Sequence, residues 1–183
     1  MSKRIGVLTF QNTINYGAVL QTYALMRYLQ NASGWKIEVI NYYNDAVTKR
    51  EKPIQLSSCR NIKHFIKFIL NRRAEVCKFK AVGAFCKQYI VYSKEDYLES
   101  AHPSFNEYEA IIAGSDQIWN LYLTDNDIKY MLDGYNGKGY SYAASIGREG
   151  ILTTQALEAI KKLRMVSVRE VSAQVELCNL GIE

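Results

Sequence analysis

The sequence predicts an α/β protein with a doubly wound, mostly parallel, Rossmann-like sheet. Patterns typical of strands and of helices alternate along the 183 residues, and this alternation favours a parallel sheet flanked by helices. The expected strands are apolar almost throughout, as strands covered on both faces are. The length and a hydrophobic content of 48% predict one Rossmann-like lobe over residues 1–183.

The first forty residues read as a strand, a helix and a second strand. Residues 4–10 are apolar and predict the first strand, and residues 36–41 predict the second. Between them, apolar side chains recur at helical spacing from residue 16 to about residue 30, where Gly34 breaks the pattern. Such a unit places its two strands parallel, with a right-handed crossover.

An insertion rich in basic residues follows. Residues 44–58 are polar and contain Pro53, which predicts a loop. Two helical patterns at about residues 60–90, with Lys and Arg between and around them, predict a basic helical hairpin that covers one edge of the sheet. Peripheral contact with an anionic membrane is the alternative use of these basic helices.

The alternation of strands and helices then resumes. Residues 109–114 and 137–145 predict strands, residues 152–163 predict a helix capped by Thr153 or Thr154, and residues 164–170 predict a last strand. A further helix begins at Val171. In two-domain enzymes with such sheets, a second lobe closes over the carboxyl ends of the strands, and we expect this second lobe to be absent from the chain.

Charge and composition narrow the classes of partner. Residues 1–90 carry 15 Lys and Arg against 4 Asp and Glu, whereas residues 91–183 carry 8 against 14, which indicates an anionic ligand or partner. The four cysteines form no C-x-x-C pair and no spacing with histidine that predicts a metal site. We expect a cytoplasmic protein without a membrane helix, and no nucleic-acid partner.

Polar residues and glycines follow four of the expected strands. The first strand is followed by Asn15, Tyr16 and Gly17; the strand at 109–113 by Gly114, Ser115, Asp116, Gln117, Trp119 and Asn120; the strand at 137–144 by Ser145 and Arg148; and the last strand by Arg169. Because the carboxyl ends of parallel strands meet at one edge, we expect these residues to line a common rim.

Each of these residues also has an ordinary structural interpretation. Asn15 is a candidate helix N-cap, Ser115 or Asp116 caps the next helix, Trp119 is a core aromatic, Gly17 relieves crowding against the sheet, and Arg148 and Arg169 are surface charges.

Together, however, they predict a ligand site. Gly114 lets a ligand approach the backbone, Asp116 accepts two hydrogen bonds or acts as general base, and each arginine holds a carboxylate or phosphate. The turn at residues 15–17 has one glycine and not the glycine-rich loop of a dinucleotide site, so we predict a single small anion or polar head group there.

Four stretches in order resemble the polysaccharide pyruvyl transferase family: NYGAVLQTYAL, IIAGSDQIWN, YSYAASIG and VSVRE. The resemblance implies one lobe of a GT-B-like two-lobe architecture. It also implies transfer of a pyruvyl group from phosphoenolpyruvate, the donor substrate, to a sugar in bacterial exopolysaccharide biosynthesis, without a cofactor. The cleft residues carried over are Asn15, Tyr16, Gly17, Ser115, Asp116, Gln117, Ser145 and Arg169. Asp116 is the candidate base.

Two classes of function stay open at this point. The first is a transferase that acts on an activated donor and a sugar or oligosaccharide, free or lipid-linked, once a second lobe completes it. The alternative is a catalytically inactive binding or regulatory module of the same fold. A homo-oligomer is compatible with both.

Overall fold

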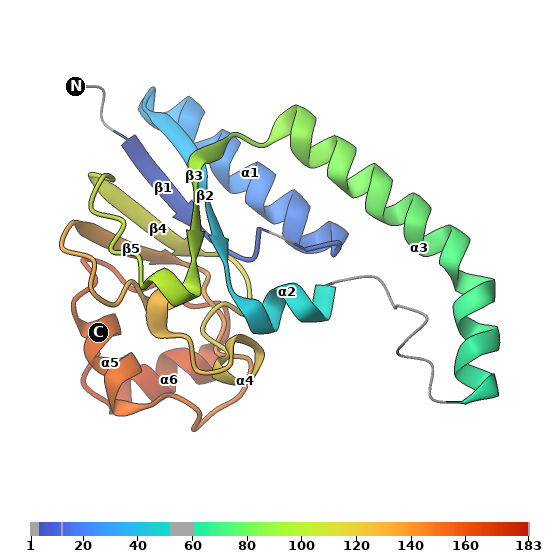
Figure 1. Ribbon diagram of the computed structural model, residues 1–183. Helices are drawn as coiled ribbons and strands as arrows, with labels where there is room; N and C mark the ends of the chain where they lie inside the picture. Colours follow the sequence, from blue (N-terminus) through green and yellow to red (C-terminus); the bar gives the residue numbers. More distant parts are fainter. Residues whose placement is uncertain (1–3, 12, 52–60, 183) are drawn as a thin grey trace.

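A five-stranded parallel sheet forms the centre of the protein. The computed structural model describes residues 4–11, 13–51 and 61–182. The strands lie in the order β3-β2-β1-β4-β5, and every neighbouring pair is parallel (Figure 1). Their bounds are β1 Arg4–Leu8, β2 Lys36–Tyr43, β3 Tyr92–Leu98, β4 Ala110–Gly114 and β5 Lys138–Tyr142. The predicted doubly wound, Rossmann-like sheet is therefore confirmed.

Helices cover both faces of this sheet. One face carries α1 (Tyr16–Ser33) and α3 (Ile62–Tyr89), and the other carries α5 (Thr154–Lys161) and α6 (Val171–Asn179) (Figure 1). Shorter elements join the strand ends: α2 (Asp45–Glu51), η2 (Glu99–Ala101), α4 (Leu121–Thr124) and η3 (Ile128–Met131). The helix cap predicted at Thr153 is confirmed, because its side chain accepts a hydrogen bond from Ala156 N at 3.2 Å.

The sheet separates two cores, and strands β1, β2 and β4 supply side chains to both of them. Successive residues of a strand point to opposite faces of the sheet, so Val7 packs with α1 and α3 whereas its neighbour Leu8 packs towards α5 and α6. The first core also takes Ile37 and Val39, and the second takes Ile40 and the fully buried Trp119. This explains why these three strands read as nearly continuous apolar runs in the sequence.

The inserted region differs from its prediction in two respects. Residues 45–51 form α2 within the predicted loop, because Asn44 Oδ1 caps the helix by accepting a hydrogen bond from Val47 N at 2.9 Å. The rest of that predicted loop, residues 52–58, lies outside the described residues. The predicted hairpin is instead the single helix α3, because the polar run Asn71–Arg73 contains no glycine or proline that would end a helix.

Two strand predictions also need correction. The structure has a strand, β3, that the sequence did not predict, because Lys94, Glu95 and Asp96 make it too polar to resemble a buried strand. The predicted last strand at 164–170 forms only two isolated parallel bridges, Tyr140 with Met165 and Ala144 with Val168. It still runs in the direction of β5 along the edge of the sheet.

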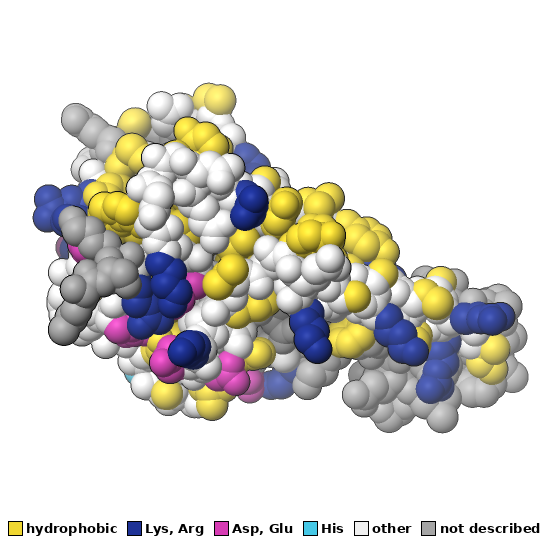
Figure 2. Space-filling view, turned by 90° about the horizontal axis from the view of Figure 1, so that it is seen from above, with side chains coloured by type: hydrophobic (Ala, Val, Ile, Leu, Met, Phe, Trp, Pro, Cys, Tyr) yellow, Lys and Arg dark blue, Asp and Glu magenta, His cyan; other side chains and the backbone are white. Residues whose placement is uncertain are grey.

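Helix α3 packs on α1 through its carboxyl-terminal part. The ring of Tyr23 lies edge-on to Phe85, with centroids 5.5 Å apart, and Val82 is buried in the same core. Towards its amino terminus α3 extends beyond the sheet, and Lys and Arg side chains alternate with apolar ones along it (Figures 1 and 2). No helix within the described ranges is both long and apolar enough to span a bilayer.

A buried carboxylate joins β1 and β2 at the amino-terminal end of the sheet. Glu38 is 1% exposed, forms ion pairs with Arg4 and Lys36, and accepts a hydrogen bond from the Tyr108 hydroxyl at 2.9 Å. Burial alone would raise the pKa of Glu38, but the hydrogen bonds from Arg4, Lys36 and Tyr108 outweigh it and lower this pKa below its ordinary value.

Candidate functional site

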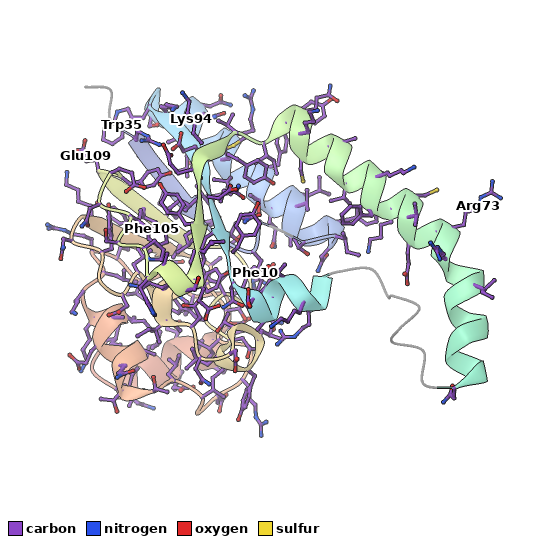
Figure 3. The ribbon with its side chains drawn as sticks, in the orientation of Figure 1. Phe10, Trp35, Arg73, Lys94, Phe105 and Glu109 are labelled. Carbon is purple, nitrogen blue, oxygen red and sulfur yellow. The ribbon has the colours of Figure 1, made fainter. Side chains whose placement is uncertain are left out.

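The carboxyl ends of the strands share one rim, as the sequence predicts. Residues 5–8 of β1 pair in parallel with residues 110–113 of β4, and residues 110–114 pair in parallel with β5. The parallel bridge between Ala144 and Val168 adds the last segment in the same direction. Figure 3 shows Phe10 at this rim beside α2, at the opposite end of the sheet from Trp35 and Glu109.

Hydrogen bonds fasten the turns of the rim to one another. Ser145 N donates to Asp116 O at 3.0 Å, and Trp119 N donates back to Ser145 O at 3.2 Å. Arg169 N donates to Ala144 O at 3.0 Å, while its guanidinium Nη2 reaches Ser115 O at 3.1 Å and Gln21 Oε1 of α1 at 3.5 Å. These hydrogen bonds hold together the turn after β4, the turn after β5, the segment that contains Val168 and Arg169, and helix α1.

A cavity of about 220 Å³ opens at this rim between β1 and β4. The turn after β1, the turn after β4, α2 and α4 form its walls, with lining residues Phe10, Thr13, Asn15, Val47, Arg50, Asp116, Gln117 and Leu123. From β1 the chain adds β2 and β3 on one side, and β4 and β5 lie on the other. The cavity therefore lies at the topological switch point, where doubly wound sheets bind their ligands.

The polar side chains of the cavity are held by their own turns. Asp116 Oδ1 accepts a hydrogen bond from Gln117 N at 2.8 Å, which orients the half-buried carboxylate. Asn15 is the N-cap of α1, because its Oδ1 accepts from Gly17 N at 3.0 Å. Its backbone N in turn donates to Thr13 Oγ1 at 3.0 Å. Asn15 thus both caps α1, as its structural interpretation predicted, and lines the cavity.

Arg50 is a residue of this cavity that the sequence reasoning missed. It lies in the last turn of α2, and its Nη2 donates to Tyr122 O at 3.0 Å. Among the described residues that line the cavity, it is the cation beside the anion Asp116. The signal that would have found it is Asn44, whose capping of Val47 begins a helix that carries Arg50 to the rim.

The two glycines and the tyrosine that the sequence predicted for the site do not line this cavity. Gly114 has φ 133°, and an added Cβ would overlap the Tyr142 carbonyl oxygen, so the absence of a side chain serves the packing of β4 on β5. An added Cβ at the exposed Gly17 would meet only the capping oxygen of Asn15, at 3.3 Å, and not the sheet. The centre of the Tyr16 ring lies 4.9 Å from Lys78 Nζ of α3, and Tyr16 is not among the residues that line the cavity.

Four further predicted residues support the rim or lie elsewhere. Trp119 is fully buried and donates from Nε1 to Tyr130 O at 3.0 Å, so it is a core aromatic and not a stacking surface. The buried Ser145 accepts from Gly147 N at 3.1 Å, and Asn120 Nδ2 donates to Gln117 Oε1 at 3.1 Å. Arg148 lines a separate cavity of about 380 Å³ beside Glu170.

The arrangement brings one cation, Arg50, and one carboxylate, Asp116, into a single small cavity, and these are groups that can hold an anion and accept a proton. No group of three or more His, Cys, Asp or Glu suited to a metal ion occurs within the described ranges.

No curated protein and no solved structure shows significant similarity to the chain. The family model for polysaccharide pyruvyl transferase matches residues 15–182, which include Asn15, Arg50, Asp116 and Arg169. The chain therefore belongs to the polysaccharide pyruvyl transferase family.

Proposed function

We propose that the chain binds phosphoenolpyruvate at the cavity between β1 and β4 and takes part in transferring its pyruvyl group to a sugar of a surface polysaccharide. The observation that carries this proposal is the position of Arg50 and Asp116 in one small cavity at the switch point of the sheet. In this proposal, the domain is one lobe of a GT-B-like pair, and a second lobe faces the rim.

The cavity has a size that suits such a donor, and Arg50 supplies a cation for one of its anionic groups. Phosphoenolpyruvate carries a phosphate and a carboxylate close together, and an arginine guanidinium binds either group through two parallel hydrogen bonds. A volume of about 220 Å³ is smaller than the pockets that hold drug-sized ligands, which favours a small anion over a dinucleotide.

The transfer forms a ketal from two hydroxyl groups of the sugar. Both hydroxyl oxygens bond to the C2 carbon of phosphoenolpyruvate, whose methylene takes up a proton to become a methyl group, and inorganic phosphate leaves with the second proton. We assign Asp116 to remove a proton from the attacking hydroxyl, because its carboxylate lines the same small cavity as Arg50, the cation of α2.

Phosphate release from phosphoenolpyruvate in the presence of oligosaccharide acceptors tests the proposal. We expect Asp116→Asn to lower the rate by at least about 100-fold while phosphoenolpyruvate binding, measured by calorimetry, persists. Asp125→Asn is the matched control, since Asp125 is exposed at φ 55°, a backbone conformation that asparagine also adopts. Binding without turnover would favour the inactive-module alternative, and absence of binding would overturn the proposal.

Other predictions about partners stay predictions. The family points to a sugar or polysaccharide acceptor. Lipid linkage of that acceptor, contact of the basic α3 with an anionic membrane, and a homo-oligomer rest on sequence reasoning. So do a cytoplasmic location and a role in bacterial exopolysaccharide biosynthesis.

A further inference from the structure

A second cavity adjoins the proposed donor site. It has a volume of about 400 Å³ and is lined by residues at the carboxyl ends of β1 and β2, by the first residue of β3, and by residues of α2 and α3. Thr13 lines both cavities. A molecule in the larger cavity would therefore lie directly beside one in the smaller cavity.

The lining of this cavity differs in charge from the donor site. Its described lining residues include none with an ionised side chain, whereas the smaller cavity contains Arg50 and Asp116. The polar groups are the amides of Gln11 and Asn41, the hydroxyls of Thr13, Thr48, Tyr43 and Tyr92, and the thiol of Cys86. An uncharged lining in the basic half of the chain does not suit phosphoenolpyruvate, and it suits an uncharged ligand rich in hydroxyl groups.

Two of the amides are held in fixed orientations. Gln11 Nε2 donates to Tyr42 O at 2.9 Å, and Asn41 Nδ2 donates to Asp96 Oδ1. With both nitrogens bound to the framework, the amide oxygens remain as acceptors for ligand hydroxyls in this part of the described chain. Such preorganised acceptors can select a ligand by the position of its hydroxyl groups.

Aromatic rings form the other part of the lining. Tyr43 and Tyr92 come from the sheet, and Phe79 comes from α3. Phe79 is 50% exposed. Residues on both sides of it contact the rest of the protein: Lys78 lies over the ring of Tyr16, and Val82 is buried. An exposed aromatic face beside fixed amide acceptors matches the two sides of a pyranose ring, one lined by C–H groups and the other by hydroxyls.

We propose that the cavity between α3 and the ends of β1 and β2 binds the neutral hexose unit of the acceptor, with Phe79 stacking on its ring and Gln11 and Asn41 accepting from its hydroxyls. This assignment rests on the proposed function, because it places the acceptor beside the phosphoenolpyruvate cavity. It also gives the α3 insertion a role, as the wall that contacts the sugar.

Titration of the 183-residue chain with methyl hexosides tests the assignment. Methyl glycosides of glucose, galactose and mannose serve as probes, and backbone NMR chemical shifts report the site. At least one of them is expected to shift signals of residues 11, 41, 43 and 92. We expect Phe79→Ala to weaken that binding about tenfold, since it removes the stacking surface. Val76→Ala, which truncates an exposed apolar residue one turn earlier on α3, should leave the affinity unchanged.

Thr48→Val provides an independent variant that keeps the side-chain shape and removes the hydroxyl group. It should weaken binding of the same hexoside several-fold.

The assignment is overturned if no hexoside shifts these signals, or if Phe79→Ala and Val76→Ala have equal effects. Phosphoenolpyruvate titrated into the same samples separates the two proposals. Donor binding without hexoside binding would reject this cavity as the acceptor site and leave the proposed function standing.

Discussion

The guanidinium of Arg169 donates a hydrogen bond to the carbonyl oxygen of Ser115, 3.1 Å away. Ser115 immediately precedes Asp116, and Arg169 also reaches Gln21 of α1. One side chain therefore links the last segment of the sheet, the turn that carries the candidate base, and the helix whose amino terminus borders the cavity.

We expect Arg169→Ala to lower phosphoenolpyruvate-dependent phosphate release at least tenfold, because the Asp116 turn loses a hydrogen bond that positions it. The free energy of unfolding should fall by only about 1 kcal/mol, the usual value for one partly exposed hydrogen bond. Arg164→Ala removes an exposed arginine from the same segment away from the turn and is the control. Equal rates for the two variants would show that Arg169 does not position the site.

Arg50 is expected to set the affinity for the donor. Arg50→Gln should raise the KM for phosphoenolpyruvate about tenfold, since it removes the cation of the cavity, and kcat should change less. Lys49→Gln removes a charge from the neighbouring position, where Lys49 pairs with Asp45, and should have little effect. Steady-state kinetics at two salt concentrations would check the assignment, because screening weakens binding of the anion.

Gly114 is expected to tolerate no side chain. Gly114→Ala should lower the free energy of unfolding by at least about 3 kcal/mol, because the new Cβ would overlap Tyr142 O and φ is 133°. Gly83→Ala is the contrasting variant: it lies within α3 with no atom near the added methyl, and should stabilise the protein by about 0.5 kcal/mol. Urea denaturation measures both. Similar stability of the two variants would contradict the packing role of Gly114.

Trp119 should affect stability and not substrate contact. Trp119→Phe removes the hydrogen bond to Tyr130 O from a fully buried position, so the free energy of unfolding should fall by about 2 kcal/mol. If the proposed function holds, the KM values of the folded protein for donor and acceptor should stay unchanged. A large rise in either KM without loss of stability would show instead that the indole ring contacts a substrate.

Glu38 should contribute to the acid sensitivity of folding. Its pKa is lower in the folded than in the unfolded state, so its stabilising effect is complete above the unfolded pKa of about 4.3 and is lost as the pH falls through that value and the lower folded pKa. Glu38→Gln should lower stability at pH 7 and flatten the decline below about pH 5. Glu158→Gln, which changes an exposed carboxylate on α5, should leave that decline as it is.

The sequence predicted the parts of the fold that are buried on both sides. The runs that form β1, β2 and β4 are mostly apolar because two cores cover them, and the repeat of apolar residues in α1 is equally clear. The run around β5 was predicted from its apolar and aromatic residues. The polar β3 at the sheet edge and the short helix α2 escaped prediction, since neither needs a continuous apolar pattern. The single helix α3 was divided in two because its middle is polar.

The sequence could predict only those residues of the candidate site that follow a strand. Asn15, Asp116 and Gln117 follow strands, so the parallel sheet alone brings them together. Arg50 was not predictable in this way, because it reaches the cavity through a helix whose packing depends on residues distant in sequence. Trp119 also follows a strand, but its indole is buried in the core and does not line the cavity. Its position after a strand could not show which way its side chain points.

Helix α3 enters the chain between two strands of the sheet and contributes one wall to the neutral cavity, while the charged cavity is built from other elements. In the proposed reaction α3 therefore borders only the acceptor cavity, whereas α2 and Thr13 border both cavities. If both proposals hold, exchanging α3 for the matching segment of another family member would alter which carbohydrate is accepted and leave the cavity of Arg50 and Asp116 unchanged.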